Sequence, residues 1–139
     1  MRKGGVGTYA LVLRLARDRE IRVGQLGVFA FPRGYYVYVG SALNGLDARI
    51  ARHARLTNKR KFWHIDYFRA HAQLIRVLRV ESRERLECAV ARELSNLPDG
   101  RVVVPRFGAS DCRCATHLFL IFPDLQFRCE YAKLLNAPL

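Results

Sequence analysis

Two residues that handle phosphate groups and protons stand one helical turn apart in this chain. Arg49 carries a guanidinium, which can hold a phosphate through two hydrogen bonds, and His53 carries an imidazole that exchanges protons near neutral pH. Tyr9 and Tyr38 add phenols, which position water or, where their pKa is lowered, deprotonate it. These residue types indicate chemistry on a phosphate group. The alternative is a core strand that carries tyrosines, beside a solvated basic helix.

A second set of residues has the composition of a metal site. Cys112, Cys114 and His117 fall within six positions, and either Cys88 or His64 would complete the four ligands of a tetrahedral zinc ion. The spacing differs from that of a standard zinc finger. The alternative is that the cysteines are small buried hydrophobic residues, and that His117 begins an apolar strand.

Length, hydrophobic content and net charge indicate the number of domains and the kind of partner. The chain has 139 residues, of which 50% are hydrophobic, so we expect a single domain over residues 1–139 with a sizeable core. Lys and Arg number 24 against 12 acidic residues, which gives a net charge of +12 and favours an anionic partner, nucleic acid above all. We expect DNA, with RNA as the alternative.

The same sequence argues against a membrane or an exported protein. Arginines interrupt every apolar run before the roughly 18 residues that a membrane span needs, and the first residues lack the apolar region of a signal peptide. We therefore expect a cytoplasmic protein without a membrane partner. Its four cysteines are then expected to be reduced thiols or metal ligands.

The hydrophobic pattern alternates between strands and helices. Period-two or β-branched runs predict strands over residues 8–16, 21–23, 35–40, 74–81, 102–104 and 118–122. We expect the second of these to pair back on the first, before Gly24 and Gly27 loosen the chain. Helical spacing predicts helices after residue 40, near 63–72 and over 82–97. Antiparallel strands followed by helices, without regular βαβ units, predict an α+β fold with a small antiparallel sheet.

The first of these helices positions the candidate phosphate-binding residues. Its cap is expected to be Ser41 or Asn44, and Arg49 and His53 should lie on a shoulder of its buried face. That face consists of apolar or small residues at helical spacing, namely Leu43, Leu46, Ile50, Ala54 and Thr57. In the next helix, His64 and Asp66 form a candidate acid–base pair, or else cap the helix beside Trp63.

Several segments of the chain resemble the GIY-YIG nuclease superfamily. In order, these are Gly7-Thr8-Tyr9, Tyr38-Val39-Gly40, Arg49-Ile50-Ala51-Arg52-His53 and a helical Glu87. Three longer blocks, over residues 34–42, 63–67 and 107–114, look like the Uri-type endonuclease branch of that superfamily. The resemblance extends from about residue 5 to residue 122.

The resemblance implies a fold and a chemistry. The fold would be a three-stranded antiparallel core, with extra strands here, flanked by helices. The activity would be hydrolysis of DNA phosphodiester bonds with one divalent metal ion, Mg²⁺ or Mn²⁺. Glu87 would bind the metal, Arg49 would stabilise charge on the phosphate, and Tyr9 and Tyr38 would line the site. His53 matches a position that relatives fill with His or Tyr.

The chain departs from the pattern of the superfamily in ways that matter for the site. Thr8 replaces the isoleucine of the name motif, and 28 residues separate Tyr9 from Tyr38, so an extra strand must be accommodated. Glu84, one helical turn before Glu87, is a competing metal ligand. Asp111 is the candidate replacement for an asparagine that many relatives carry.

Basic residues extend the Arg49 side of the molecule. Near a nucleic-acid backbone each would add affinity that depends on salt but not on sequence, and the set comprises Arg52, Arg55, Lys59, Arg60 and Lys61. The alternative for such a run is a solvated helix face. No base-reading motif accompanies it.

Three hypotheses follow for the function. The favoured one is a metal-dependent DNA endonuclease. The second is a nucleic-acid-binding module on the same scaffold that is catalytically weak or inactive and is stabilised by zinc. The third is an enzyme that acts on an anionic small molecule.

Overall fold

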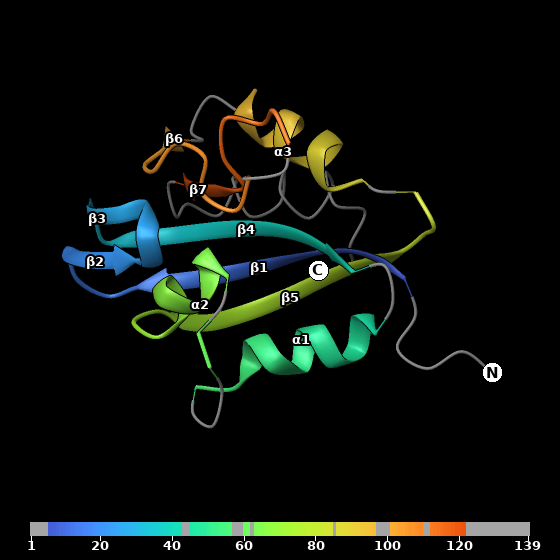
Figure 1. The fold of residues 1–139 in the computed structure, drawn as a ribbon, viewed down its shortest axis with the longest axis horizontal. Coiled ribbons are helices and arrows are strands. Elements are labelled where there is room, and N and C mark those ends of the chain that lie inside the picture. The colour runs from blue at the N-terminus through green and yellow to red at the C-terminus, as the bar shows by residue number, and fades with distance from the viewer. Residues whose placement is uncertain are drawn as a thin grey trace.

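The computed structural model describes residues 6–42, 45–56, 60–61, 63–84, 86–96, 101–109 and 112–121. It has the predicted α+β class (Figure 1). Its first half contains β1 (Gly7–Leu15), β2 (Arg19–Val23), the 3₁₀ turn η1 (Gly24–Leu26), β3 (Gly27–Phe31), β4 (Gly34–Ala42) and α1 (Leu46–Ala54). Its second half contains α2 (His64–Arg69), β5 (Gln73–Glu81), α3 (Glu87–Ser95), β6 (Arg101–Val102) and β7 (Leu118–Ile121).

The main sheet has five antiparallel strands in the order β5-β1-β4-β7-β6. Strand β4 lies at its centre, between β1 and β7, and its register with β1 places Tyr9 opposite Gly40. Strand β7 pairs with β4 only along Tyr35–Tyr38. The last residues of β4, from 39 to 42, therefore extend beyond β7, and the candidate site forms around this end of the strand.

Both faces of the sheet are covered. On one face, residues of β1 and β4 such as Leu11 and Tyr36 pack with α1, α2 and the β2–β3 hairpin. On the other face, Val37 and Val39 pack against Ala91 and Leu94 of α3. Figure 1 shows this arrangement, with α1 and α2 on the side of the β1–β4–β5 strands opposite to α3. A site at the end of β4 can therefore receive side chains from both layers of helices.

The extra residues between β1 and β4 form a hairpin of their own. Strand β2 pairs with β3 in a separate two-stranded sheet, so the prediction that it pairs with β1 is wrong, and β3 was not predicted. Gly24 and Gly27 were expected to loosen the chain, but their φ angles of 51° and 127° provide the tight turn between the two strands. Ile21 and Phe31 anchor the hairpin to the core. The insertion is thus accommodated without separating Tyr9 from Tyr38.

Helix α1 begins later than predicted and buries a different face. Ser41 lies within β4 rather than at the cap, where Gly45 adopts a φ of 65°, and Asn44 lies outside the described residues. Leu46 and His53 are buried, whereas Ala54 is exposed, so the predicted position of His53 on the shoulder of the buried face is corrected. The imidazole is buried because it packs against tyrosines of the sheet.

The other predicted elements change mainly at their ends. The helix predicted over residues 82–97 begins at Glu87, which places this residue in the first helical turn. None of the helices in the described ranges has the length and apolar character that crossing a bilayer requires.

Candidate active site and metal centre

Two tyrosines and a histidine from three different elements meet at the end of β4. The hydroxyl of Tyr9 on β1 lies 2.8 Å from Nε2 of His53 on α1. The ring of Tyr38 on β4 lies 6.4 Å from that of Tyr9 and 6.2 Å from that of His53, measured between centroids. All three side chains are buried. The structure therefore brings together three of the predicted site residues.

Gly40 makes this arrangement possible, because the ring of Tyr9 lies across it. A Cβ atom at residue 40 would stand 2.5 Å from the Tyr9 hydroxyl oxygen and 2.6 Å from the ring carbon that bears it. Any side chain there would displace the phenol. The glycine in the Tyr38-Val39-Gly40 segment is thus needed for close approach.

Arg49 joins the same group of residues from α1. Its guanidinium lies 4.4 Å from the centre of the Trp63 ring and donates a hydrogen bond of 3.1 Å to the backbone carbonyl of Ser41. Among the described residues, no carboxylate lies within ion-pair distance of it. Its positive charge therefore remains available to an anionic ligand.

Glu87 reaches this end of β4 from the opposite layer. The hydroxyl of Ser41 donates a 2.9 Å hydrogen bond to its Oε1, and only 13% of the Glu87 side chain is exposed. The residue before it is fixed to β1, since the Leu86 amide donates a 3.2 Å hydrogen bond to the hydroxyl of Thr8. Thr8, which replaces the isoleucine of the expected motif, thus anchors the start of α3.

The competing carboxylate, Glu84, occupies a different position. It is exposed in the turn before α3, where its backbone amide donates to the hydroxyl of Ser82. Glu87, in contrast, raises the pKa of both Tyr9 and Tyr38 by its negative charge. Of the two glutamates, Glu87 is therefore the one at the site.

Both phenols are neutral at physiological pH. Burial raises the pKa of Tyr9 to about 12, with Glu87 and Asp66 adding to the rise and Arg49 opposing it through its charge and a hydrogen bond. Burial also raises the pKa of Tyr38 well above its ordinary value. The lowered pKa that a tyrosinate base requires is therefore not found for either phenol.

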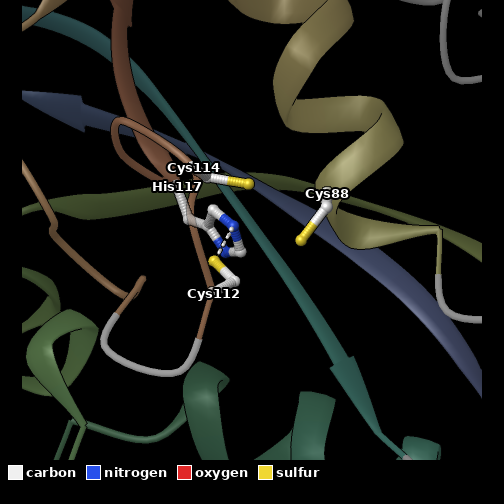
Figure 2. Close-up of side chains that lie close together, drawn as sticks. All are labelled: Cys88, Cys112, Cys114 and His117. Carbon is white, nitrogen blue, oxygen red and sulfur yellow. Dashed lines mark hydrogen bonds between the residues drawn. The ribbon is translucent and has the colours of Figure 1, made fainter.

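Three cysteines and one histidine form a second cluster beside the first. The sulfur atoms of Cys88, Cys112 and Cys114 and a ring nitrogen of His117 all lie within 4.8 Å of one another. Figure 2 shows them pointing toward a common centre, with Cys88 on α3 and the others on the segment that leads into β7. This Cys₃His cluster can bind a metal ion.

Cys88, rather than His64, completes this cluster. His64 is engaged elsewhere, since its Nδ1 accepts a 2.8 Å hydrogen bond from the Gly108 amide. In the cluster, burial and hydrogen bonds to Cys88 and Cys112 raise the pKa of the Cys114 thiol to about 12. Closely spaced thiolates are stable only beside a cation, which is the situation that metal binding creates.

The basic residues of the predicted ridge fall into two groups. Arg52 is held by Asp66, whose carboxylate accepts hydrogen bonds of 2.7 and 2.9 Å from it, and its guanidinium also lies 4.5 Å from the centre of the Trp63 ring. The others within the described residues, Arg55, Arg60 and Lys61, are exposed, whereas Lys59 lies outside the described ranges.

Asp66 has a structural position rather than a place in an acid–base pair. It is fully buried, pairs with Arg52, and accepts a 2.9 Å hydrogen bond from the Trp63 amide at the start of α2. The helix-cap alternative is therefore the correct one. Asp111, the candidate replacement for an asparagine, lies outside the described residues.

Sequence reasoning did not assign site roles to three positioning residues. Ser41 binds Glu87 and Arg49, and Trp63 stacks on Arg49. Arg69 is buried in α2, and its guanidinium donates hydrogen bonds of 2.9 and 3.0 Å to the carbonyls of His53 and Ala54, which end α1. Arg69 shares the buried face of α2 with Ile65, Asp66 and Phe68, and this helical spacing was the available signal for it.

His64 makes the stability of this region depend on pH. Burial lowers its pKa, so the unfolded chain binds the proton more readily than the folded protein does. The stabilisation is therefore present above the unfolded pKa of about 6.5 and is lost as the pH falls. We expect urea denaturation at pH 7.5 and 5.5 to show a smaller loss of stability for His64→Gln than for the wild type. An unchanged loss in this variant would contradict the assignment.

Comparison with known proteins yields one match. A family model described as "Domain of unknown function DUF123" matches residues 8–136. No curated protein and no solved structure shows significant similarity to the chain. Because this match spans nearly the whole chain, the chain belongs to the DUF123 family.

Proposed function

We propose that this protein is a metal-dependent DNA endonuclease of the GIY-YIG type. The observation that carries the proposal is the convergence of Tyr9, Tyr38, Arg49, His53 and Glu87, from four separate elements, at the end of β4. A plain structural core would not need, within one group, a guanidinium that forms no ion pair among the described residues, a partly exposed carboxylate and buried phenols.

Arg49 is proposed to bind the scissile phosphate. Stacking on Trp63 and the hydrogen bond to Ser41 fix the guanidinium before a substrate arrives. A cation held in advance stabilises the charge that develops on the phosphate oxygens in the transition state.

Glu87 is proposed to hold Mg²⁺ or Mn²⁺. The fit is chemical: its carboxylate is a hard oxygen ligand, it keeps part of its surface exposed, and Ser41 orients it. Mg²⁺ commonly binds through one or two carboxylates, with water and substrate phosphate as the remaining ligands. When bound, the ion would supply stabilisation of the leaving oxygen and a more acidic attacking water.

Tyr9 and His53 are proposed to handle the proton of the attacking water. With its pKa raised to about 12, Tyr9 is a neutral phenol that can accept a hydrogen bond from water while donating its own to Nε2 of His53. The proton lost by water would then pass from the phenol to the imidazole. Tyr38 packs against both rings and holds them in place.

Arg55, Arg60 and Lys61, which lie between α1 and α2, are proposed to bind the nucleic-acid backbone beside the cut. They are exposed, and the net charge of +12 favours association with a polyanion. We expect binding that weakens steeply with salt. Arg52 contributes mainly by fixing Asp66 and Trp63.

We also propose that the Cys₃His cluster binds structural zinc. Three thiolates and one imidazole are a common donor set for a closed, tetrahedral zinc site, and the four ligand atoms already lie within 4.8 Å of one another. A reducing compartment such as the cytoplasm would keep these cysteines available as ligands. This zinc is separate from the catalytic ion proposed at Glu87.

The test of the endonuclease proposal is cleavage by the purified protein. Supercoiled plasmid and a panel of duplex, branched and single-stranded DNAs, with an RNA of matched sequence, should be incubated with Mg²⁺ or Mn²⁺ from zero to 10 mM. We expect metal-dependent nicking that EDTA stops. Salt-sensitive DNA binding without cleavage would instead favour the nucleic-acid-binding module. Absence of DNA binding would favour an anionic small molecule as substrate.

Replacing Tyr9 tests the proposed proton pathway. Tyr9→Phe removes only the hydroxyl that bonds His53, and we expect the single-turnover cleavage rate to fall roughly 100-fold or more. Tyr36→Phe is the matched control, because Tyr36 is a buried tyrosine of β4 whose hydroxyl bonds the carbonyl of Pro32. Equal rates in the two variants would contradict the role of Tyr9.

A further inference from the structure

We infer that His117 is a positioning residue that links the proposed zinc site to Glu87. The inference rests on the proposed function, since it concerns how the catalytic carboxylate is held. It assigns the two ring nitrogens of His117 to different partners: Nε2 to the metal and Nδ1 to Glu87.

The contacts of the imidazole support this division. Its Nε2 lies 3.5 Å from the sulfur of Cys112, on the side of the Cys₃His cluster. Its Nδ1 lies 3.7 Å from Oε2 of Glu87, on the side of the candidate active site. A histidine that binds a metal through Nε2 carries its proton on Nδ1, and that N–H characteristically faces a carboxylate or carbonyl.

The backbone of His117 is fixed to the sheet. Its carbonyl accepts a 3.0 Å hydrogen bond from the Val39 amide, and its own amide donates a 2.8 Å hydrogen bond to the Phe107 carbonyl. The side chain is only 2% exposed. A carboxylate held by this imidazole therefore has a fixed position relative to β4, the strand that also carries Tyr38.

Cys88 fixes the Glu87 side of the contact between His117 and Glu87. It follows Glu87 directly in the first turn of α3, so a metal bound by Cys88 and His117 joins the start of this helix to the segment before β7. Glu87 is then restrained at both carboxylate oxygens, by the Ser41 hydroxyl at Oε1 and by His117 near Oε2. A zinc site of this kind sets the orientation of the catalytic glutamate as well as stabilising the fold.

The experiment separates metal binding from positioning. His117→Cys keeps four zinc ligands but removes the Nδ1–H group, whereas Cys114→His keeps four ligands and leaves His117 in place. We expect both variants to retain one zinc per chain by mass spectrometry. In the zinc-loaded proteins without DNA, electron paramagnetic resonance should show Mn²⁺ binding weakened roughly 10- to 100-fold by His117→Cys and little changed by Cys114→His. Wild-type Mn²⁺ affinity in a zinc-loaded His117→Cys protein would overturn the inference.

A second measurement uses the wild type alone, so that it does not depend on how a variant folds. Long-range ¹H–¹⁵N correlation spectra of the zinc-loaded protein should show His117 with its proton on Nδ1. A proton on Nε2 would overturn the inference. If the wild type binds Mn²⁺ as expected but cuts no DNA, the proposed function fails while the link between His117 and Glu87 stands.

Discussion

Glu87→Gln is expected to reduce metal-dependent DNA nicking by about a thousandfold while leaving DNA binding intact. The side chain keeps its size and its hydrogen-bond acceptor for Ser41, but it loses the negative charge that would hold a divalent cation. A bound cation supplies several kcal/mol of stabilisation to the transition state, and each 1.4 kcal/mol corresponds to a factor of ten in rate. The measurement is the single-turnover rate of plasmid nicking at saturating protein.

Glu84→Gln is the matched control for this prediction. It removes the same charge three residues earlier in the sequence, from an exposed residue in the turn before α3. The nicking rate of this variant should stay within about twofold of the wild type, since exposed charges have small effects. A large loss in Glu84→Gln with little loss in Glu87→Gln would reverse the assignment of the two carboxylates.

The second large effect is expected from loss of the metal ion proposed at the Cys₃His cluster. In a double variant, Cys112→Ser with Cys114→Ser, two of the four ligands lose their thiolates, so the start of α3 is no longer joined to the segment before β7. A metal present at about a thousand times its dissociation constant contributes about 4 kcal/mol to folding. At roughly 3 °C per kcal/mol for a chain of this size, the melting temperature should fall by about 12 °C.

Calorimetry of the zinc-loaded wild type, the chelated wild type and the double variant checks this prediction. Chelation should lower the melting temperature of the wild type toward that of the variant and should not change the variant. Stoichiometric zinc should restore the wild type only. Equal melting temperatures with and without zinc would show that the cysteines pack as small apolar residues.

Much of the fold could be predicted from the sequence, because its strongest patterns are local. The alternation in β1 and the aromatic, β-branched run of β4 specify strands whichever partners they find. The β2–β3 hairpin was not predicted, because it depends on contacts with distant residues rather than on a local pattern. Its glycines suggested a loose connection, whereas the burial of Ile21 and Phe31 against the core decides that the segment folds as a second sheet.

In the candidate site, too, some features could be predicted from the sequence, whereas others depend on contacts between distant residues. Tyr9, Tyr38, Arg49, His53 and Glu87 were chosen from residue type, spacing and resemblance, and the fold brings them together. The groups that orient them could not be predicted. The contact of Ser41 with Glu87, or of Trp63 with Arg49, joins residues far apart in the sequence and depends on where β7 leaves the end of β4 uncovered.

Nicking of supercoiled plasmid by wild type and Glu87→Gln, purified in parallel and titrated with Mg²⁺, tests the central claim most directly. The account predicts that the wild type converts the plasmid to the open-circular form with saturable Mg²⁺ dependence, and that the variant binds the plasmid equally well but leaves it supercoiled. Equal nicking by both proteins, or none by a wild type that binds DNA and retains its zinc, would contradict the account.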